Sequence, residues 1–172
     1  MAVYQYYLAV VPKQGIEKKH GSIPNKIGVN VETGYFESDA ELYWKEVSMK
    51  ADNIVAKMDL FVERAKWGND KTSVNWKTYS KDVDNDATIY LDEESLTIKE
   101  FSFRADLREN NLAFLKNMIE LGKANECLFF DRNGKLMNPN FEEIIINIQN
   151  SNAYSFINDP IKFIENIGNE NK

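Results

Sequence analysis

The densest group of residues that could do chemistry is an acidic run between positions 82 and 94, with six carboxylates and no basic residue. Four of the six stand where positions 1, 3, 5 and 12 of an EF-hand calcium loop would stand. Ala87 replaces the glycine that such a loop needs, and the flanking residues have the pattern of strands instead of helices. We therefore expect no metal site here, and a calcium-modulated adaptor is only an alternative. The six acids are Asp82, Asp84, Asp86, Asp92, Glu93 and Glu94.

The same six acids can also form a docking surface. A turn needs only one or two Asp or Asn residues, so six uncompensated acids exceed what a turn requires. A dense negative charge steers association with a basic partner. A solvated loop is the alternative. We predict that these six residues contact the basic surface of a partner protein.

A second candidate site is the row Arg104, Asp106 and Arg108, which alternates with apolar residues. Alternate residues of a strand share one face, so the three side chains are predicted to lie together on a polar face. Such a row can bind an anion or hold a substrate carboxylate. Alternatively, it forms a salt-bridged surface or a clamp onto the following helix.

The residue types that usually carry catalysis are scarce. His20 is the only histidine and lies between Lys19 and Gly21, where we expect it to be exposed and inert. Cys127 is the only cysteine, so no internal disulfide can form, and its apolar surroundings predict burial. No glycine-rich phosphate-binding motif and no paired carboxylates are recognisable. We predict no catalytic residues and no cofactor.

The first element that must position these residues is an N-terminal strand. Residues 4–11 are aromatic and β-branched, and they end before Pro12, which is typical of a buried strand. Residues 13–36 hold half of the eight glycines together with several lysines, which predicts a long loop. The loop is interpreted as a surface insertion or an irregular hairpin, and a functional role stays open.

A long helix is predicted after this loop. Ser38 and Glu41 have the spacing of a capping box, and apolar residues then recur every three or four positions until Gly68. The apolar stripe is about six turns long and is widened by Val55 and Val62. This width favours packing on a sheet over a coiled-coil dimer seam.

Residues beyond position 72 change to a period of two. Residues 74–78, 87–91 and 96–107 are predicted to form an antiparallel meander, and a slip in the alternation near Lys99 and Glu100 indicates a β-bulge. A helix from Asn110, a short strand pair within residues 127–137, a helix over residues 141–148 and a last helix capped by Asp159 follow.

This order of elements predicts an α+β fold. We expect an antiparallel sheet of four to six strands with a long helix and several C-terminal helices packed mainly on one face. No linker or repeat divides the chain, so residues 1–172 are predicted to form a single globular domain.

Composition narrows the class of partner. The formal net charge is −6 and the sequence pI is about 5.0, which argues against a protein that coats nucleic acid or anionic lipid. No apolar run approaches the roughly 18 residues of a membrane helix, and the N-terminus lacks the features of a secretory signal. We therefore expect a cytoplasmic protein, with a monomer favoured.

The second half contains a set of segments with a recognisable pattern: residues 101–108, Phe114, Leu115, residues 128–134, Pro139 and residues 151–160. These segments resemble small bacterial immunity-type proteins that are encoded beside polymorphic toxins. The resemblance implies a non-catalytic protein that binds one cognate toxin and blocks its active site, and it assigns no functional residues. A small hydrolase that uses the Arg104 row with a pocket at the long loop is the alternative.

Overall fold

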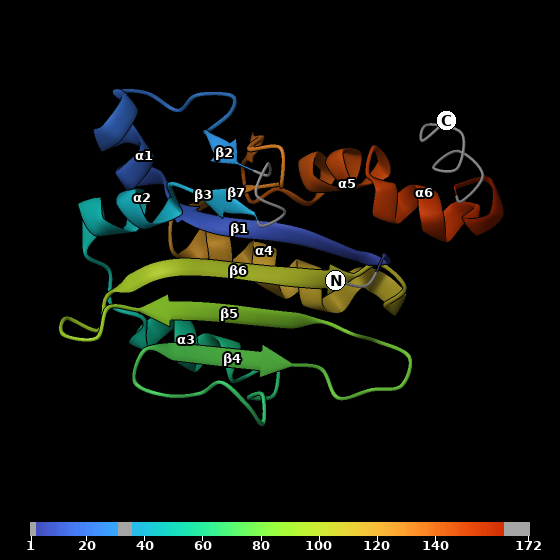
Figure 1. Ribbon diagram of the computed structural model, residues 1–172, viewed down its shortest axis with the longest axis horizontal. Helices are drawn as coiled ribbons and strands as arrows, with labels where there is room; N and C mark the ends of the chain where they lie inside the picture. Colours follow the sequence, from blue (N-terminus) through green and yellow to red (C-terminus); the bar gives the residue numbers. More distant parts are fainter. Residues whose placement is uncertain (1–2, 31–35, 164–172) are drawn as a thin grey trace.

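The computed structural model describes residues 3–30 and 36–163, and its centre is a six-stranded antiparallel sheet (Figure 1). The strand order is β4-β5-β6-β1-β7-β8. Together with the helices, this sheet confirms the α+β class. The strands are β1 (Gln5–Pro12), β4 (Ser73–Lys77), β5 (Asp86–Leu91), β6 (Ile98–Asp106), β7 (Cys127–Phe130) and β8 (Leu136–Met137).

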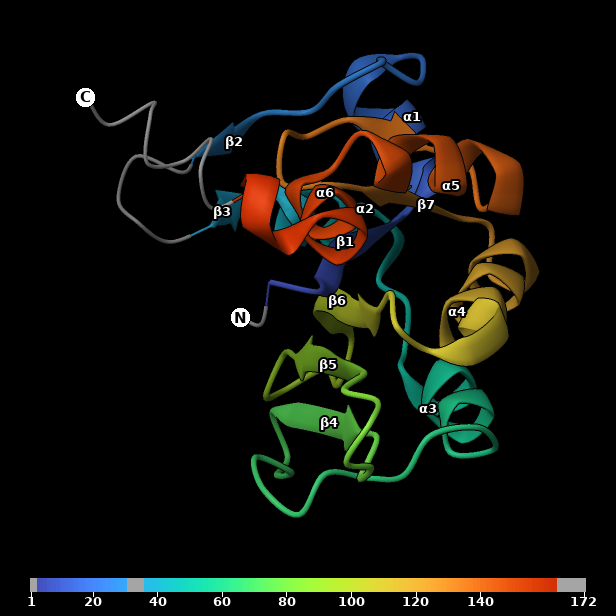
Figure 2. The ribbon, with the colours of Figure 1, turned by 90° about the vertical axis from the view of Figure 1, so that its right-hand side faces the viewer.

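The helices form layers on the two faces of this sheet (Figure 2). One face packs against α3, α4 and α5, and the larger core lies between them. The other face carries α1, α2 and the small hairpin β2–β3 beside β1 and β7. The elements are α1 (Lys13–His20), β2 (Val29–Asn30), β3 (Glu37–Ser38), α2 (Ala40–Val47), α3 (Asp52–Met58), η1 (Asn110–Leu112), α4 (Ala113–Ala124), α5 (Phe141–Gln149) and α6 (Asn152–Asn158).

The N-terminal strand β1 is apolar on both faces, as expected for a buried strand. Leu8 and Val10 enter the larger core, whereas Ala9 and Val11 enter the smaller core under α1 and α2. Because successive side chains of a strand point to opposite faces, one strand serves both layers. β1 therefore lies at the centre of the molecule, between β6 and β7.

The predicted meander is confirmed as β4, β5 and β6, which are antiparallel neighbours in sequence order. Tyr90 pairs with Glu100 and Leu91 pairs with Ile98, so Lys99 is the extra residue of a β-bulge. The bulge lies where the sequence pattern predicts it. The outer edge of β4 is covered by the chain that precedes it. Ala65 N donates a hydrogen bond to the Asn75 carbonyl oxygen at 2.8 Å.

The prediction of one long helix up to Gly68 is wrong, because the chain forms two shorter helices, α2 and α3. Ser48 adopts a left-handed φ of 47°, and the Met49 carbonyl accepts a hydrogen bond from Ile98 N at 2.8 Å. This contact with the start of β6 interrupts the helix and carries the chain from one face of the sheet to the other. Ile54 and Met58 are fully buried, so their assignment to the core is confirmed.

The predicted capping box is also wrong. Ser38 belongs to β3, and the N-cap of α2 is Asp39, whose side chain makes no capping hydrogen bond. By contrast, Asp159 caps the last helical turn as predicted, because its carboxylate accepts a hydrogen bond from Lys162 N at 3.0 Å.

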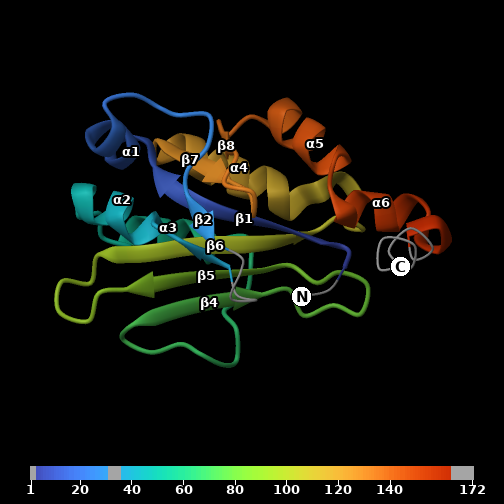
Figure 3. The ribbon, with the colours of Figure 1, turned by 45° about the horizontal axis from the view of Figure 1, so that its top comes forward.

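The predicted long loop over residues 13–36 contains helix α1, which lies beside α2 at one end of β1 (Figure 3). Gly15 allows this approach, since a Cβ there would lie 2.1 Å from the Tyr43 carbonyl oxygen. Gly21 ends the helix in the left-handed region. Ile16 is the one large apolar residue that α1 buries, so the helix has little periodic signal. Residues 31–35 of the predicted loop lie outside the described residues.

Candidate functional site

Among the described residues, α2 packs against one end of β6 on the face of β4, β5 and β6 that points away from α3 and α4, and the rest of this face carries no helix (Figure 2). We call it the open face. Its side chains are polar and arranged in ranks across the strands, in contrast to the apolar opposite face. The open face comprises Ser73, Asn75, Lys77, Asp86, Thr88, Tyr90, Glu100, Ser102 and Arg104. Three of these residues, Ser73, Asn75 and Asp86, are buried, and Ser73 and Asn75 donate hydrogen bonds to the Gly68 carbonyl in the chain before β4.

One cross-strand row of the open face is a ladder of ion pairs. It runs through Lys77, Asp86 and Arg104. These residues are cross-strand neighbours. Arg104 Nε donates to Asp86 Oδ1 at 2.7 Å, and Lys77 Nζ lies 4.0 Å from Asp86 Oδ2. Lys77 also pairs with Asp84 in the loop before β5. Positive and negative charges thus alternate along this rank.

Asp106, at the end of β6, is a buried anchor for the loop between β4 and β5. Its carboxylate accepts hydrogen bonds from Asp84 N at 2.8 Å and from Arg108 Nη2 at 2.6 Å. Burial pushes the pKa of Asp106 upward, but these hydrogen bonds and the charge of Arg108 outweigh burial, so the pKa lies below its usual value. Asp106 N in turn donates to Asn85 Oδ1 at 2.7 Å.

The predicted row of Arg104, Asp106 and Arg108 is therefore internally paired. Arg104 binds Asp86, and Arg108 binds Asp106 and also stacks on Tyr4, with its guanidinium carbon 3.4 Å from the ring centroid. An external anion would have to compete with these carboxylates. The row thus forms salt bridges, which is the alternative to an anion-binding row.

Strand β5 divides the acidic run into two groups. Asp82, Asp84 and Asp86 lie before the strand or at its start, whereas Asp92, Glu93 and Glu94 form the turn to β6. Six strand residues separate the groups by about 20 Å, at about 3.3 Å per residue. The six acids thus do not form one continuous surface.

The two groups also differ in exposure. Asp86 is buried in its ion pairs, while Glu93 and Glu94 are exposed. Glu93 pairs with Lys71, and Asp92 accepts a hydrogen bond from Ser95 N at 2.9 Å that helps to hold the turn. Whether either group binds a partner stays a prediction.

The same separation affects the calcium alternative. Asp86 and Glu93 lie at opposite ends of β5, so the EF-hand spacing in the sequence does not converge on one ion. Within the described residues, no three or more His, Cys, Asp or Glu side chains are grouped so that they could hold a metal ion.

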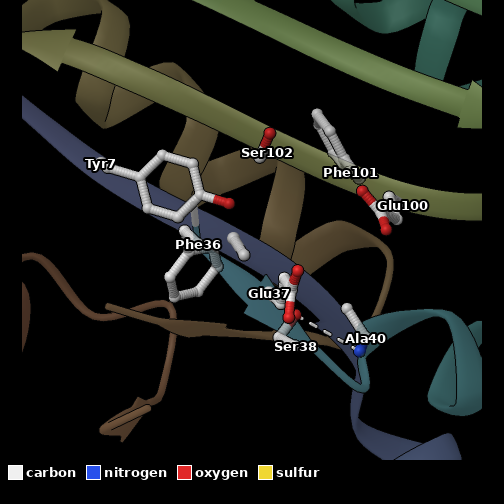
Figure 4. A pocket seen from close by; sticks show the side chains of 9 residues that line it. Tyr7, Phe36, Glu37, Ser38, Ala40, Glu100, Phe101 and Ser102 are labelled. Atoms are coloured by element: carbon white, nitrogen blue, oxygen red, sulfur yellow. Dashed lines mark hydrogen bonds between the residues drawn. The ribbon is translucent and has the colours of Figure 1, made fainter. Parts of the chain in front are cut away.

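A pocket of about 250 Å³ lies beside the open face, between β3 and the β1–β6 pair (Figure 4). Tyr7 and Phe36 form an aromatic wall, with ring centroids 5.1 Å apart. The carboxylates of Glu37 and Glu100 and the hydroxyl of Ser102 complete the polar lining. Glu100 also lines a second pocket of about 280 Å³, which contains Tyr90, Glu41 and Lys99.

Burial and neighbouring charges shift the pKa values of Glu100 and Tyr7 in the first pocket. Glu100 keeps contact with solvent, yet the surrounding protein removes part of its hydration, which together with the negative charge of Glu41 raises its pKa. Burial raises the pKa of Tyr7 to about 12, although a hydrogen bond with Ser102 acts in the opposite direction. Tyr7 therefore stays a neutral phenol at physiological pH.

His20 and Cys127 lie away from this pocket. His20 is exposed, and its Nε2 lies 3.0 Å from the Tyr43 hydroxyl. Cys127 is 2% exposed, and burial raises its pKa to about 12, so the thiol stays protonated and is a poor nucleophile.

Comparison with known families, curated proteins and solved structures adds no further evidence. No family model, curated protein or solved structure matches this chain. The geometry and charge of the site therefore carry the functional argument.

Over residues 3–30 and 36–163, none of the helices has the length and apolar character needed to cross a bilayer.

The pocket residues were not predicted as site residues. Alternation along the first and the long meander strand places Tyr7, Ser102 and Glu100 on one face, so this signal could have found three of them. Glu37 and Phe36 carry no comparable signal, because they reach the pocket through a two-residue strand within a stretch interpreted mainly as loop.

Proposed function

We propose that the protein is an immunity-type inhibitor that binds a cognate protein toxin through the open face and the adjacent turn at residues 92–94. The observation that carries the proposal is that Tyr90, Thr88, Glu100 and Ser102 keep contact with solvent on this polar sheet face, while α3 and α4 cover the opposite face of the same strands. The proposal keeps the cytoplasmic location expected from the sequence.

Tyr90 is the best candidate for an anchor of this interface. Its side chain is 50% exposed at the middle strand of the open face, between Ser73 and Glu100. Tyrosine contributes a large rigid contact area and one hydroxyl, and it is enriched among residues that dominate binding energy. Thr88 and Glu100 beside it keep contact with solvent and supply a polar rim.

Charge supports a basic partner. The net charge of the chain is −6, and the turn beside Tyr90 carries Asp92, Glu93 and Glu94. A toxin that acts on a phosphate-bearing substrate needs a positive active site, and an acidic surface can occupy that site and speed association. In this proposal the protein inhibits by occupying the active site of the toxin, and the inhibitor itself undergoes no reaction.

The test compares Tyr90→Ala with the matched control Ile146→Ala, using as probe the purified product of the gene immediately upstream, where the proposal expects the toxin. Ile146 is 60% exposed on α5, away from the open face. We expect Tyr90→Ala to raise Kd at least tenfold, mainly through faster dissociation, and Ile146→Ala to leave it unchanged. Biolayer interferometry measures both rates. Equal effects of the two substitutions, or no complex with the wild-type protein, would contradict the proposal.

A further inference from the structure

We propose that the pocket between β3 and β6 receives an arginine side chain of the bound partner, held between the carboxylates of Glu37 and Glu100 and the ring of Tyr7. This inference rests on the proposed function of the open face and assigns a chemical class to the anchor that the partner supplies.

The shape of the pocket suits a flat, partly apolar group. Tyr7 and Phe36 stand at one end, and Glu100 and Ala40 stand toward the other, with Glu37 between them (Figure 4). At about 250 Å³, the pocket has room for one long side chain and little more. An arginine stem can pack on the aromatic wall while its guanidinium reaches the carboxylates.

The positive charge of Lys99 acts on Glu100, but Lys99 and Arg104 are paired with other carboxylates. Lys99 lies 3.3 Å from Glu41, and Arg104 is bound to Asp86. Glu37 accepts a hydrogen bond from Asn30 Nδ2 at 3.3 Å. In the part of the chain that the structure describes, no basic group lies within ion-pair distance of Glu37 or Glu100.

A cation in the pocket would relieve an unfavourable arrangement. Partial desolvation and the neighbouring Glu41 disfavour the ionised form of Glu100, Lys99 offsets this only in part, and a further positive charge in the pocket favours the ionised form. Tyr7 already takes part in a similar contact on the protein itself, since the guanidinium carbon of Arg132 lies 5.4 Å from its ring centroid. The Tyr7 ring thus already accepts a guanidinium from within the protein, and the edge of the ring that lines the pocket is the part left for a second one.

Arginine fits this set of groups better than lysine. Its planar guanidinium presents five donors, can bind two carboxylates at once and stacks on aromatic rings. The ammonium of lysine is a compact, strongly hydrated charge that uses the aromatic wall less well. We therefore assign the pocket to arginine.

The inference is tested on the free protein, with N-butylguanidinium as the probe and the neutral isostere N-butylurea as its control. Titration followed by two-dimensional ¹H–¹⁵N NMR should show saturable shifts at Tyr7, Glu37 and Ser102 with a millimolar Kd. N-butylurea should produce shifts at least tenfold weaker at the same concentration. Equal responses to both compounds, or none with the cation, would overturn the inference.

Matched variants locate the binding. The double substitution Glu37→Gln with Glu100→Gln should weaken N-butylguanidinium binding at least tenfold, while Glu142→Gln on α5 leaves it unchanged. Unaltered binding by the double variant would also overturn the inference. Because this titration needs no toxin, its failure is distinguishable from failure of the proposed function, which is judged on the Tyr90→Ala complex.

Discussion

At the scale of single residues, Asp106 is the side chain on which the end of the open face depends. It is fully buried and accepts hydrogen bonds from the backbone of Asp84 and from the side chain and backbone of Arg108. A buried carboxylate is tolerated only when such donors surround it. Its removal therefore affects the β4–β5 loop as well as the ion pair.

We predict that Asp106→Asn lowers the free energy of unfolding by about 2–4 kcal/mol at pH 7, because Arg108 and the loop amides lose their charged acceptor. Urea unfolding followed by circular dichroism measures the change. Asp82→Asn, at an exposed position, is the control and should have almost no effect.

Comparison of the wild-type protein with Asp106→Asn also gives a prediction for the pH dependence of stability. The folded pKa of Asp106 lies below its unfolded value of about 3.9, so its contribution is present above that value and is lost as pH falls through the folded pKa. The stability difference between wild type and Asp106→Asn should be constant from about pH 5 to 8 and shrink below about pH 4. A difference that stays constant at about pH 3 would show that Asp106 stabilises the fold without its charge.

At the scale of elements, the contact between α1 and α2 depends on Gly15. A Cβ at Gly15 would lie 2.1 Å from the Tyr43 carbonyl oxygen, whereas a Cβ at Gly28 would meet nothing within 4 Å. We predict that Gly15→Ala lowers the free energy of unfolding by about 1–3 kcal/mol through this clash.

The control for that prediction is Gly28→Ala, which should be neutral or stabilise by up to about 1 kcal/mol by restricting the unfolded chain. Thermal unfolding by calorimetry compares the two variants. If Gly15→Ala unfolds at the same temperature as Gly28→Ala, the close packing of α1 on α2 is wrong.

Elements with a strong period were predictable from the sequence. The meander, its bulge at Lys99 and the strand β1 follow from alternation, because each buries a complete face. Helix α1 was missed because Ile16 is the one large apolar residue it buries. The break between α2 and α3 was missed because it depends on a distant hydrogen bond, from Ile98 to Met49, while the apolar stripe continues across it.

At the scale of the whole molecule, the sheet decides which predicted site residues meet. It brings Asp86 to Arg104, residues 18 positions apart, and it holds Asp86 away from Glu93 although they are close in sequence. The pocket combines β1, β3 and β6, so its composition depends on tertiary packing that local patterns do not encode. The candidate site was therefore predictable in part only, through the charged row.

The positions of the helices on the sheet determine which face of β4, β5 and β6 a partner can contact. Helices α3 and α4 cover one face of β4, β5 and β6, so a protein that pairs with these strands has the open face available. Lys77 and Lys99 lie on or beside that face, whereas Lys116 and Lys123 lie on α4. These lysines report which side of the molecule a toxin contacts.

The most direct test is therefore lysine acetylation footprinting by mass spectrometry, with and without the product of the gene immediately upstream, where the proposal expects the toxin. Binding through the open face predicts that Lys77 and Lys99 lose reactivity at least severalfold in the complex, while Lys116 and Lys123 react as in the free protein. Protection of Lys116 and Lys123 with unchanged reactivity of Lys77 and Lys99 would place the partner on the helical face and contradict the account.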